Sequence, residues 1–89
     1  MPRVVNKRRE GIPTGAVYVG RPTKWGNPFE INRDGNREEV IAKHREWFLY
    51  SEEAQALRDA VRELRGKDLV CWCAPAGCHA DLLLLLANA

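Results

Sequence analysis

The sequence has 89 residues, of which 45% are hydrophobic and 29% charged, and its formal net charge is +2. These values are typical of one globular domain. They exclude a disordered tail, a large two-domain enzyme and a membrane-spanning chain, because no apolar run approaches the roughly 18 residues that a span needs. Residues 1–10 are basic and lack the apolar core of a secretory signal peptide. We therefore expect a single domain over residues 1–89 in the cytoplasm, or in the host cytoplasm if a phage encodes the chain.

Two short runs of β-branched and aromatic residues, at 4–5 and 16–20, predict two strands that are either a hairpin or neighbours in one sheet. Residues 20–36 show neither helical nor strand periodicity. An irregular stretch of this length is uncommon in a small domain and is usually functional or disordered. Trp25, Phe29 and Ile31 can anchor it to a core, so we expect an ordered binding loop.

Residues 37–50 show the apolar periodicity of a helix, with Asn36 as its N-cap. The apolar face of this helix includes His44, which we expect at the edge of the core. Ser51 is expected to cap a second helix that stops at Gly66. Residues 68–73 predict a buried strand, residues 74–77 a turn, and the next residues a last helix that begins at Cys78 or His79 and runs through Leu86.

The order β-β-α-α-β-α predicts an α/β fold, with a small sheet of about three strands packed by helices. The long connection between the second and third strands indicates that these two strands are parallel. In open α/β sheets, ligands bind beyond the carboxyl ends of the strands. The segments that follow the second and third strands are therefore where we look for a site.

The loop at residues 21–29 carries side chains suited to a phosphate-bearing ligand. Arg21 and Lys24 can bind phosphate, Trp25 can stack on a base, and Asn27 can hydrogen-bond a base or ribose. Gly26 lets the backbone approach the ligand. The alternative is that Trp25 and Phe29 fill the core while the cations are solvated.

The segment 71–81 contains four residues that can bind zinc: Cys71, Cys73, Cys78 and His79. Structural zinc sites usually pair their ligands as C-x₂₋₄-C and H-x₃₋₅-H, and the C-x-C followed by an adjacent C-H found here fits no familiar zinc finger. A zinc-stabilised interaction module therefore stays an alternative. Another alternative is that the cysteines are inert core residues.

The start of the last helix offers a different chemistry. Backbone N–H groups and the helix dipole attract anions at such a position and lower the pKa of a thiol. Cys78 is then a candidate nucleophile, with His79 as its base and Asp81 as a third catalytic candidate. Asp81 could equally serve only the helix dipole.

Positive charge is concentrated at the N-terminal end. Residues 1–25 hold six cations and one acid, and the remainder holds eight cations and eleven acids. Such a basic end indicates an anionic partner. A protein-binding role for Lys7, Arg8 and Arg9 is a further alternative.

Two separated strings, VYVGRPTKWGNPF at 17–29 and LRGKDLVCWCAPAGCHADLL at 64–83, resemble the signatures of an uncharacterised bacterial and phage family, domain of unknown function 4326. The resemblance spans nearly the whole chain and implies no activity, because none is assigned to the family. It places both signatures on the two segments described above, which could meet in one pocket.

The leading hypothesis is that this pocket binds a phosphate-bearing ligand, a nucleotide or a nucleic-acid end. The ligand-binding candidates are Arg21, Lys24, Trp25, Gly26 and Asn27. Whether the protein is an enzyme stays open, and zinc is the only cofactor that the sequence suggests.

Overall fold

Strand β3 (Leu69–Cys71) lies at the centre of a three-stranded sheet in the computed structural model, which describes residues 2–72 and 78–89. Strands β1 (Val4–Asn6) and β2 (Val17–Tyr18) flank it, and both run parallel to it. Leu69 is aligned with Val4 on one side and with Val17 on the other. The predicted α/β class is thus confirmed. The first two strands are neither a hairpin nor neighbours in the sheet, because β3 lies between them.

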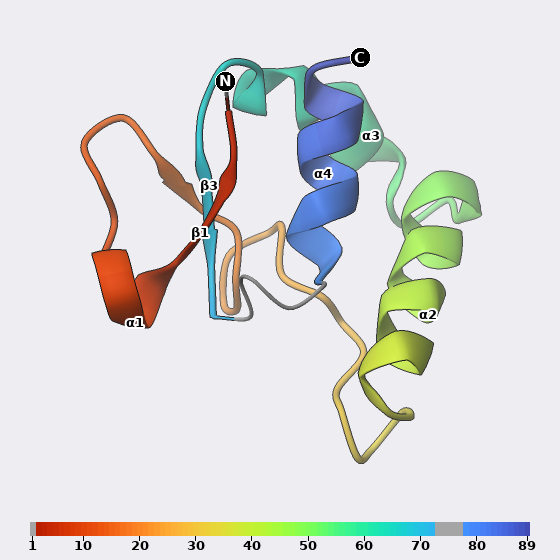
Figure 1. The fold of residues 1–89 in the computed structure, drawn as a ribbon. Coiled ribbons are helices and arrows are strands. Elements are labelled where there is room, and N and C mark those ends of the chain that lie inside the picture. Colours follow the sequence, from red (N-terminus) through yellow and green to blue (C-terminus); the bar gives the residue numbers. More distant parts are fainter. Residues whose placement is uncertain (1, 73–77) are drawn as a thin grey trace.

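The helices cover this sheet in layers. Helix α4 (His79–Ala87) packs against β1 and β3 and also contacts α2 (Arg37–Tyr50), so that it lies between the sheet and α2 (Figure 1). The core between these layers is built from apolar side chains of the sheet, the loop and the helices: Val19, Trp25, Phe48, Leu64, Leu69 and Leu83. No helix within residues 2–72 and 78–89 is long and apolar enough to cross a membrane.

Helix α2 occupies the predicted range because its start is encoded locally. The Asn36 Oδ1 atom accepts a hydrogen bond from the Glu39 backbone N–H at 2.9 Å, and Glu39 Oε1 accepts one from the Asn36 backbone N–H at 3.0 Å. This reciprocal capping box satisfies backbone donors that the first helical turn leaves without partners. Val40, His44 and Phe48 then lie one turn apart and are buried.

The second predicted helix is shorter and more irregular than its sequence pattern indicated. The structure has α3 (Gln55–Ala60) followed by a 3₁₀-helix, η1 (Val61–Leu64). Ser51 Oγ accepts from the Ala54 backbone N–H at 3.2 Å, so Ser51 starts a turn rather than the helix itself. Arg58 Nη1 donates to the carbonyl oxygens of Phe48 and Ser51, both at 2.7 Å, and holds α3 against the end of α2.

A one-turn helix that the sequence analysis did not predict, α1 (Lys7–Glu10), follows β1 directly. Asn6 caps it, because its Oδ1 atom accepts from the backbone N–H groups of Arg8 and Arg9 at 2.8 and 3.3 Å. Four basic or acidic residues carry no apolar periodicity, so pattern analysis could not detect this turn.

His44 is buried in the core, and neither of its ring nitrogens has a hydrogen-bond partner within the described part of the chain. Its ring centroid lies 5.7 Å from that of Phe48 and 5.2 Å from that of His79. Burial and, to a smaller extent, the neighbouring His79 together lower the pKa of His44 to about 4. The folded protein therefore keeps His44 neutral.

This lowered pKa predicts acid-sensitive stability. Between the ordinary pKa of 6.5 and about 4, the unfolded chain binds a proton at His44 that the folded chain does not, so the free energy of unfolding falls as the pH falls through this range. Urea unfolding of the wild type and of His44→Leu should be compared at about pH 7 and about pH 4.5. We expect the wild type to lose about 2 kcal/mol more than the variant. An equal loss in both proteins would contradict the assignment.

Candidate functional site

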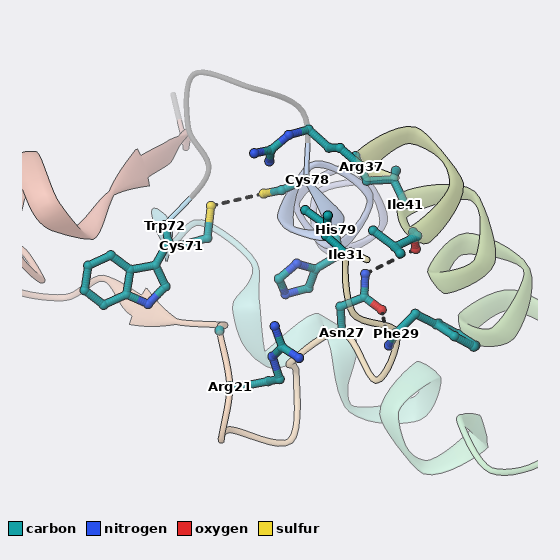
Figure 2. Close-up of a pocket in the computed structure, with 12 residues that line it drawn as sticks. Arg21, Asn27, Phe29, Ile31, Arg37, Ile41, Cys71, Trp72, Cys78 and His79 are labelled. Atoms are coloured by element: carbon teal, nitrogen blue, oxygen red, sulfur yellow. Dashed lines mark hydrogen bonds between the residues drawn. The ribbon is translucent and has the colours of Figure 1, made fainter. Parts of the chain in front are cut away.

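A cavity of about 150 Å³ lies where β2 and β3 end. Three parts of the chain form it: the loop after β2, the first turns of α2, and the end of β3 together with the start of α4 (Figure 2). The two segments singled out in the sequence therefore meet at one site. The lining residues are Gly20, Arg21, Asn27, Phe29, Ile31, Arg37, Val40, Ile41, Cys71, Trp72, Cys78 and His79.

A short hydrogen-bond chain fixes the entry to this loop. Trp72 Nε1 donates to the Tyr18 hydroxyl at 2.8 Å, and that hydroxyl donates to the Arg21 carbonyl oxygen at 2.9 Å. The Tyr18 ring crosses directly over Gly20, where a Cβ atom would lie 2.5 Å from the Tyr18 hydroxyl oxygen. Glycine is therefore required at position 20 for the tyrosine to join β3 to the loop.

Gly26 lies against Arg21, and its role in ligand binding stays a prediction. A Cβ atom on Gly26 would lie 2.8 Å from Arg21 Cγ and 3.1 Å from the Arg21 backbone. Gly26 is not one of the residues that line the cavity. Its small size instead lets the turn close tightly on Arg21.

Asn27 lines the cavity, but its side-chain amide is already engaged at both ends (Figure 2). Nδ2 donates to the Val40 carbonyl oxygen at 3.2 Å, and Oδ1 accepts from the Phe29 backbone N–H at 2.9 Å. These bonds tie the loop to α2. Asn27 thus holds the cavity wall in place, and a direct contact with a base or ribose stays a prediction.

Two arginines reach the cavity from separate elements. Arg21 Nη1 lies 2.9 Å from Glu30 Oε1, in a pair whose side chains are both largely exposed. Arg37 is exposed and makes no ion pair within residues 2–72 and 78–89. In the view of Figure 2, Arg21 and Arg37 lie on either side of His79. Sequence analysis missed Arg37, because nothing in a helical pattern marks a first-turn residue as part of a site.

His79 is an anchor for the start of α4. Its Nε2 donates to the Val19 carbonyl oxygen at 2.7 Å, and the residue is 8% exposed. Burial lowers the pKa of His79, and the hydrogen bond to Val19 partly offsets that effect. Asp81 Oδ2 accepts from the Cys78 backbone N–H at 3.1 Å, as a helix cap. Both side chains therefore position backbone, and the catalytic roles suggested for Cys78, His79 and Asp81 stay predictions.

The loop residues Lys24 and Trp25 lie outside the cavity lining. Trp25 is 5% exposed and belongs to the core, which is the alternative that the sequence analysis left open. Lys24 Nζ lies 5.1 Å from the centroid of the Trp25 ring and 3.5 Å from Glu63 Oε2. The phosphate contact of Lys24 and the stacking role of Trp25 stay predictions.

The exposed indole at the cavity belongs to Trp72, which the sequence analysis did not select. Trp72 is 53% exposed, whereas the preceding Cys71 is 1% exposed. Lys7 Nζ lies 4.6 Å from a ring centroid of Trp72, so the basic N-terminal end lies beside the cavity. The sequence did contain a signal for the exposure of Trp72. Side chains alternate between the two faces of a strand, so Trp72 points outward when Cys71 points inward.

The sulfur atoms of Cys71 and Cys78 lie 3.0 Å apart. In the ranges 2–72 and 78–89, no group of three or more His, Cys, Asp or Glu side chains is arranged to hold a metal ion. Cys73, which completes the predicted zinc set, lies outside the described residues.

Comparison with known proteins agrees with the resemblance noted in the sequence. The family described as "Domain of unknown function (DUF4326)" matches residues 4–89. An Enterobacteria phage T4 protein, described as "Uncharacterized 12.4 kDa protein in nrdA-td intergenic region", is 34% identical over 88 residues, which cover 97% of this chain and 77% of that protein. No solved structure matches the chain.

The close approach of Tyr18 to Gly20 predicts an energetic coupling between the two positions. Gly20→Ala should lower the free energy of unfolding by about 1–3 kcal/mol, because the added methyl group displaces the tyrosine ring. In a Tyr18→Ala background, the same change should cost less than about 0.5 kcal/mol. A double-mutant cycle from urea unfolding measures this coupling. Equal costs in both backgrounds would show that the ring does not constrain position 20.

Proposed function

This chain belongs to the family described as domain of unknown function 4326, and we propose that its cavity binds the phosphate group of a nucleotide or of a nucleic-acid end. The observation that carries this proposal is that Arg21 and Arg37 both line the cavity, beside the start of α4. We assign no reaction to the site.

Arginine suits this role because its planar guanidinium group can donate two parallel hydrogen bonds to one phosphate. Arg37 has no ion pair in the described residues that a ligand would have to break. Arg21 has one with Glu30, but the two side chains are 57% and 43% exposed. Exposed pairs contribute about 0–1 kcal/mol, so a doubly charged phosphate can compete for Arg21.

The position of the cavity adds a further contribution. The nine-residue helix α4 begins at its edge, with Cys78 and His79 in the lining. The N-terminus of a helix carries a partial positive charge and favours anions. Two side-chain cations and one helix terminus therefore converge on a small volume.

The size and lining of the cavity indicate how a larger ligand would lie. Pockets that enclose a whole small molecule measure about 300–1,000 Å³, so about 150 Å³ holds the phosphate and only part of the group attached to it. The remainder would lie across the rim, where Trp72 exposes its indole. Bases stack on exposed aromatic rings, so this part of the ligand is expected to be a nucleobase.

The phosphate contact is tested by calorimetric titration with an oligonucleotide of a few residues, with and without a 5′-phosphate. The phosphorylated form should bind more tightly. Arg37→Ala should weaken its binding by about 10- to 100-fold, since a hydrogen bond to a charged group contributes about 1.5–3 kcal/mol. The matched control is Arg45→Ala, an exposed arginine on the same helix that does not line this cavity. Equal binding of both oligonucleotides, or an equal loss in the control, would refute the proposal.

The stacking contact is tested separately with Trp72→Ala. Binding of a nucleoside monophosphate should weaken by about 1–3 kcal/mol, whereas binding of inorganic phosphate should not change. The melting temperature of the variant checks that the fold survives loss of the bond to Tyr18. If both ligands lost the same affinity, Trp72 would shape the phosphate site rather than hold a base.

A further inference from the structure

Two thiol groups face each other across the base of the cavity. Cys71 is the last residue of β3 and Cys78 immediately precedes α4, and their Sγ atoms lie 3.0 Å apart (Figure 2). A disulfide bond brings two sulfurs to about 2.05 Å. The sulfurs therefore need to approach by only about 1 Å to reach bonding distance.

The pair is also reachable from solvent through the cavity. Cys71 is 1% exposed and Cys78 is 4% exposed, so both are shielded from bulky reagents. Both nevertheless line the same cavity as the exposed side chains of Arg37 and Trp72. A small reagent that enters the cavity can thus contact the sulfurs, which distinguishes this pair from cysteines sealed in a core.

The surroundings favour Cys78 as the attacking group. A thiolate at the N-terminus of a helix is stabilised by the helix dipole. In the view of Figure 2, the guanidinium group of Arg37 lies beside Cys78. The carboxylate of Asp81 opposes this effect, but it is engaged by the Cys78 backbone N–H.

We propose that Cys71 and Cys78 form a redox-active dithiol that reduces low-molecular-weight disulfides. The Cys78 thiolate attacks one sulfur of the disulfide, whose S–S bond breaks, and the leaving thiolate takes up a proton. The Cys71 thiolate then attacks Cys78 Sγ, and the second thiolate leaves and is protonated. The two protein thiols become one disulfide, and the substrate disulfide becomes two thiols. This activity does not depend on the proposed phosphate binding.

The test uses the reduced protein in anaerobic buffers of oxidised and reduced glutathione, quenched by alkylation and measured by intact mass. Cys73→Ser leaves only Cys71 and Cys78, and should convert fully to a monomeric intramolecular disulfide that dithiothreitol reverses. In the wild type, chymotrypsin can cut after Trp72, which separates Cys71 from the other two cysteines. Fragmentation of the linked peptide, which holds both Cys73 and Cys78, should place the link to Cys71 on Cys78 and the alkyl group on Cys73.

Two further variants give the order of the steps. Cys71→Ser should stop at a mixed disulfide between Cys78 and glutathione, whereas Cys78→Ser should react at least about tenfold more slowly. The proposal is overturned if Cys73→Ser keeps both thiols alkylatable or accumulates glutathione adducts without closing. A wild-type disulfide that involves Cys73 would overturn it as well. If Cys73→Ser fails to fold, the disulfide mapped in the wild-type protein tests the proposal instead.

Discussion

The buried strand β3 is the constraint on which the rest of the molecule depends. Leu69 and Val70 have no exposed surface and Cys71 is 1% exposed, because strands lie on both sides of β3 and α4 packs against it. A strand enclosed in this way must pair through every backbone group that it buries. It also brings Cys71 and Trp72 to the same edge of the sheet as the loop after β2, and so fixes where a site can form.

Around that edge, the residues divide into those whose side chains bond the backbone and those whose side chains stay exposed at the cavity. His79, Asn27 and Asp81 use their side chains on backbone groups of the loop, of α2 and of α4 itself. Such bonds satisfy backbone groups that irregular loops would otherwise leave buried without partners. Arg37 and Trp72 project from this framework, beside side chains of His79, Asn27 and Asp81 that are already engaged.

The parts of the structure that local sequence determines could be predicted well. Helix α2 agrees with its predicted range because Asn36 and Glu39 encode its start within four residues of chain. The meeting of the loop after β2 with the segment after β3 also followed from the sequence, since parallel strands end at the same edge of a sheet.

The identity of the residues at the cavity was harder to predict, because it depends on packing between distant segments. Trp25 looked able to stack on a ligand or to fill the core, whereas Trp72 was not selected as a site residue. Packing of the folded chain buries Trp25 in the core and leaves Trp72 exposed. Arg37 lines the cavity because of the way in which α2 packs, and no local sequence pattern predicts that packing. The parallel pairing of β1 with β3 spans most of the chain and had no local signal either.

The order of the strands has a consequence for synthesis on the ribosome. Both β1 and β2 pair with β3 in the described sheet, and Val4 meets Leu69 across most of the chain. Strand β1 therefore stays unpaired in the sheet while residues 7–68 are translated, and β2 while residues 19–68 are translated. During that time α2 can form from local signals alone. Pairing at such long range closes slowly. The β-branched segments of β1 and β2 must therefore avoid pairing with other chains until β3 has been synthesised. Strand β3 then completes the sheet and the edge at which the cavity forms.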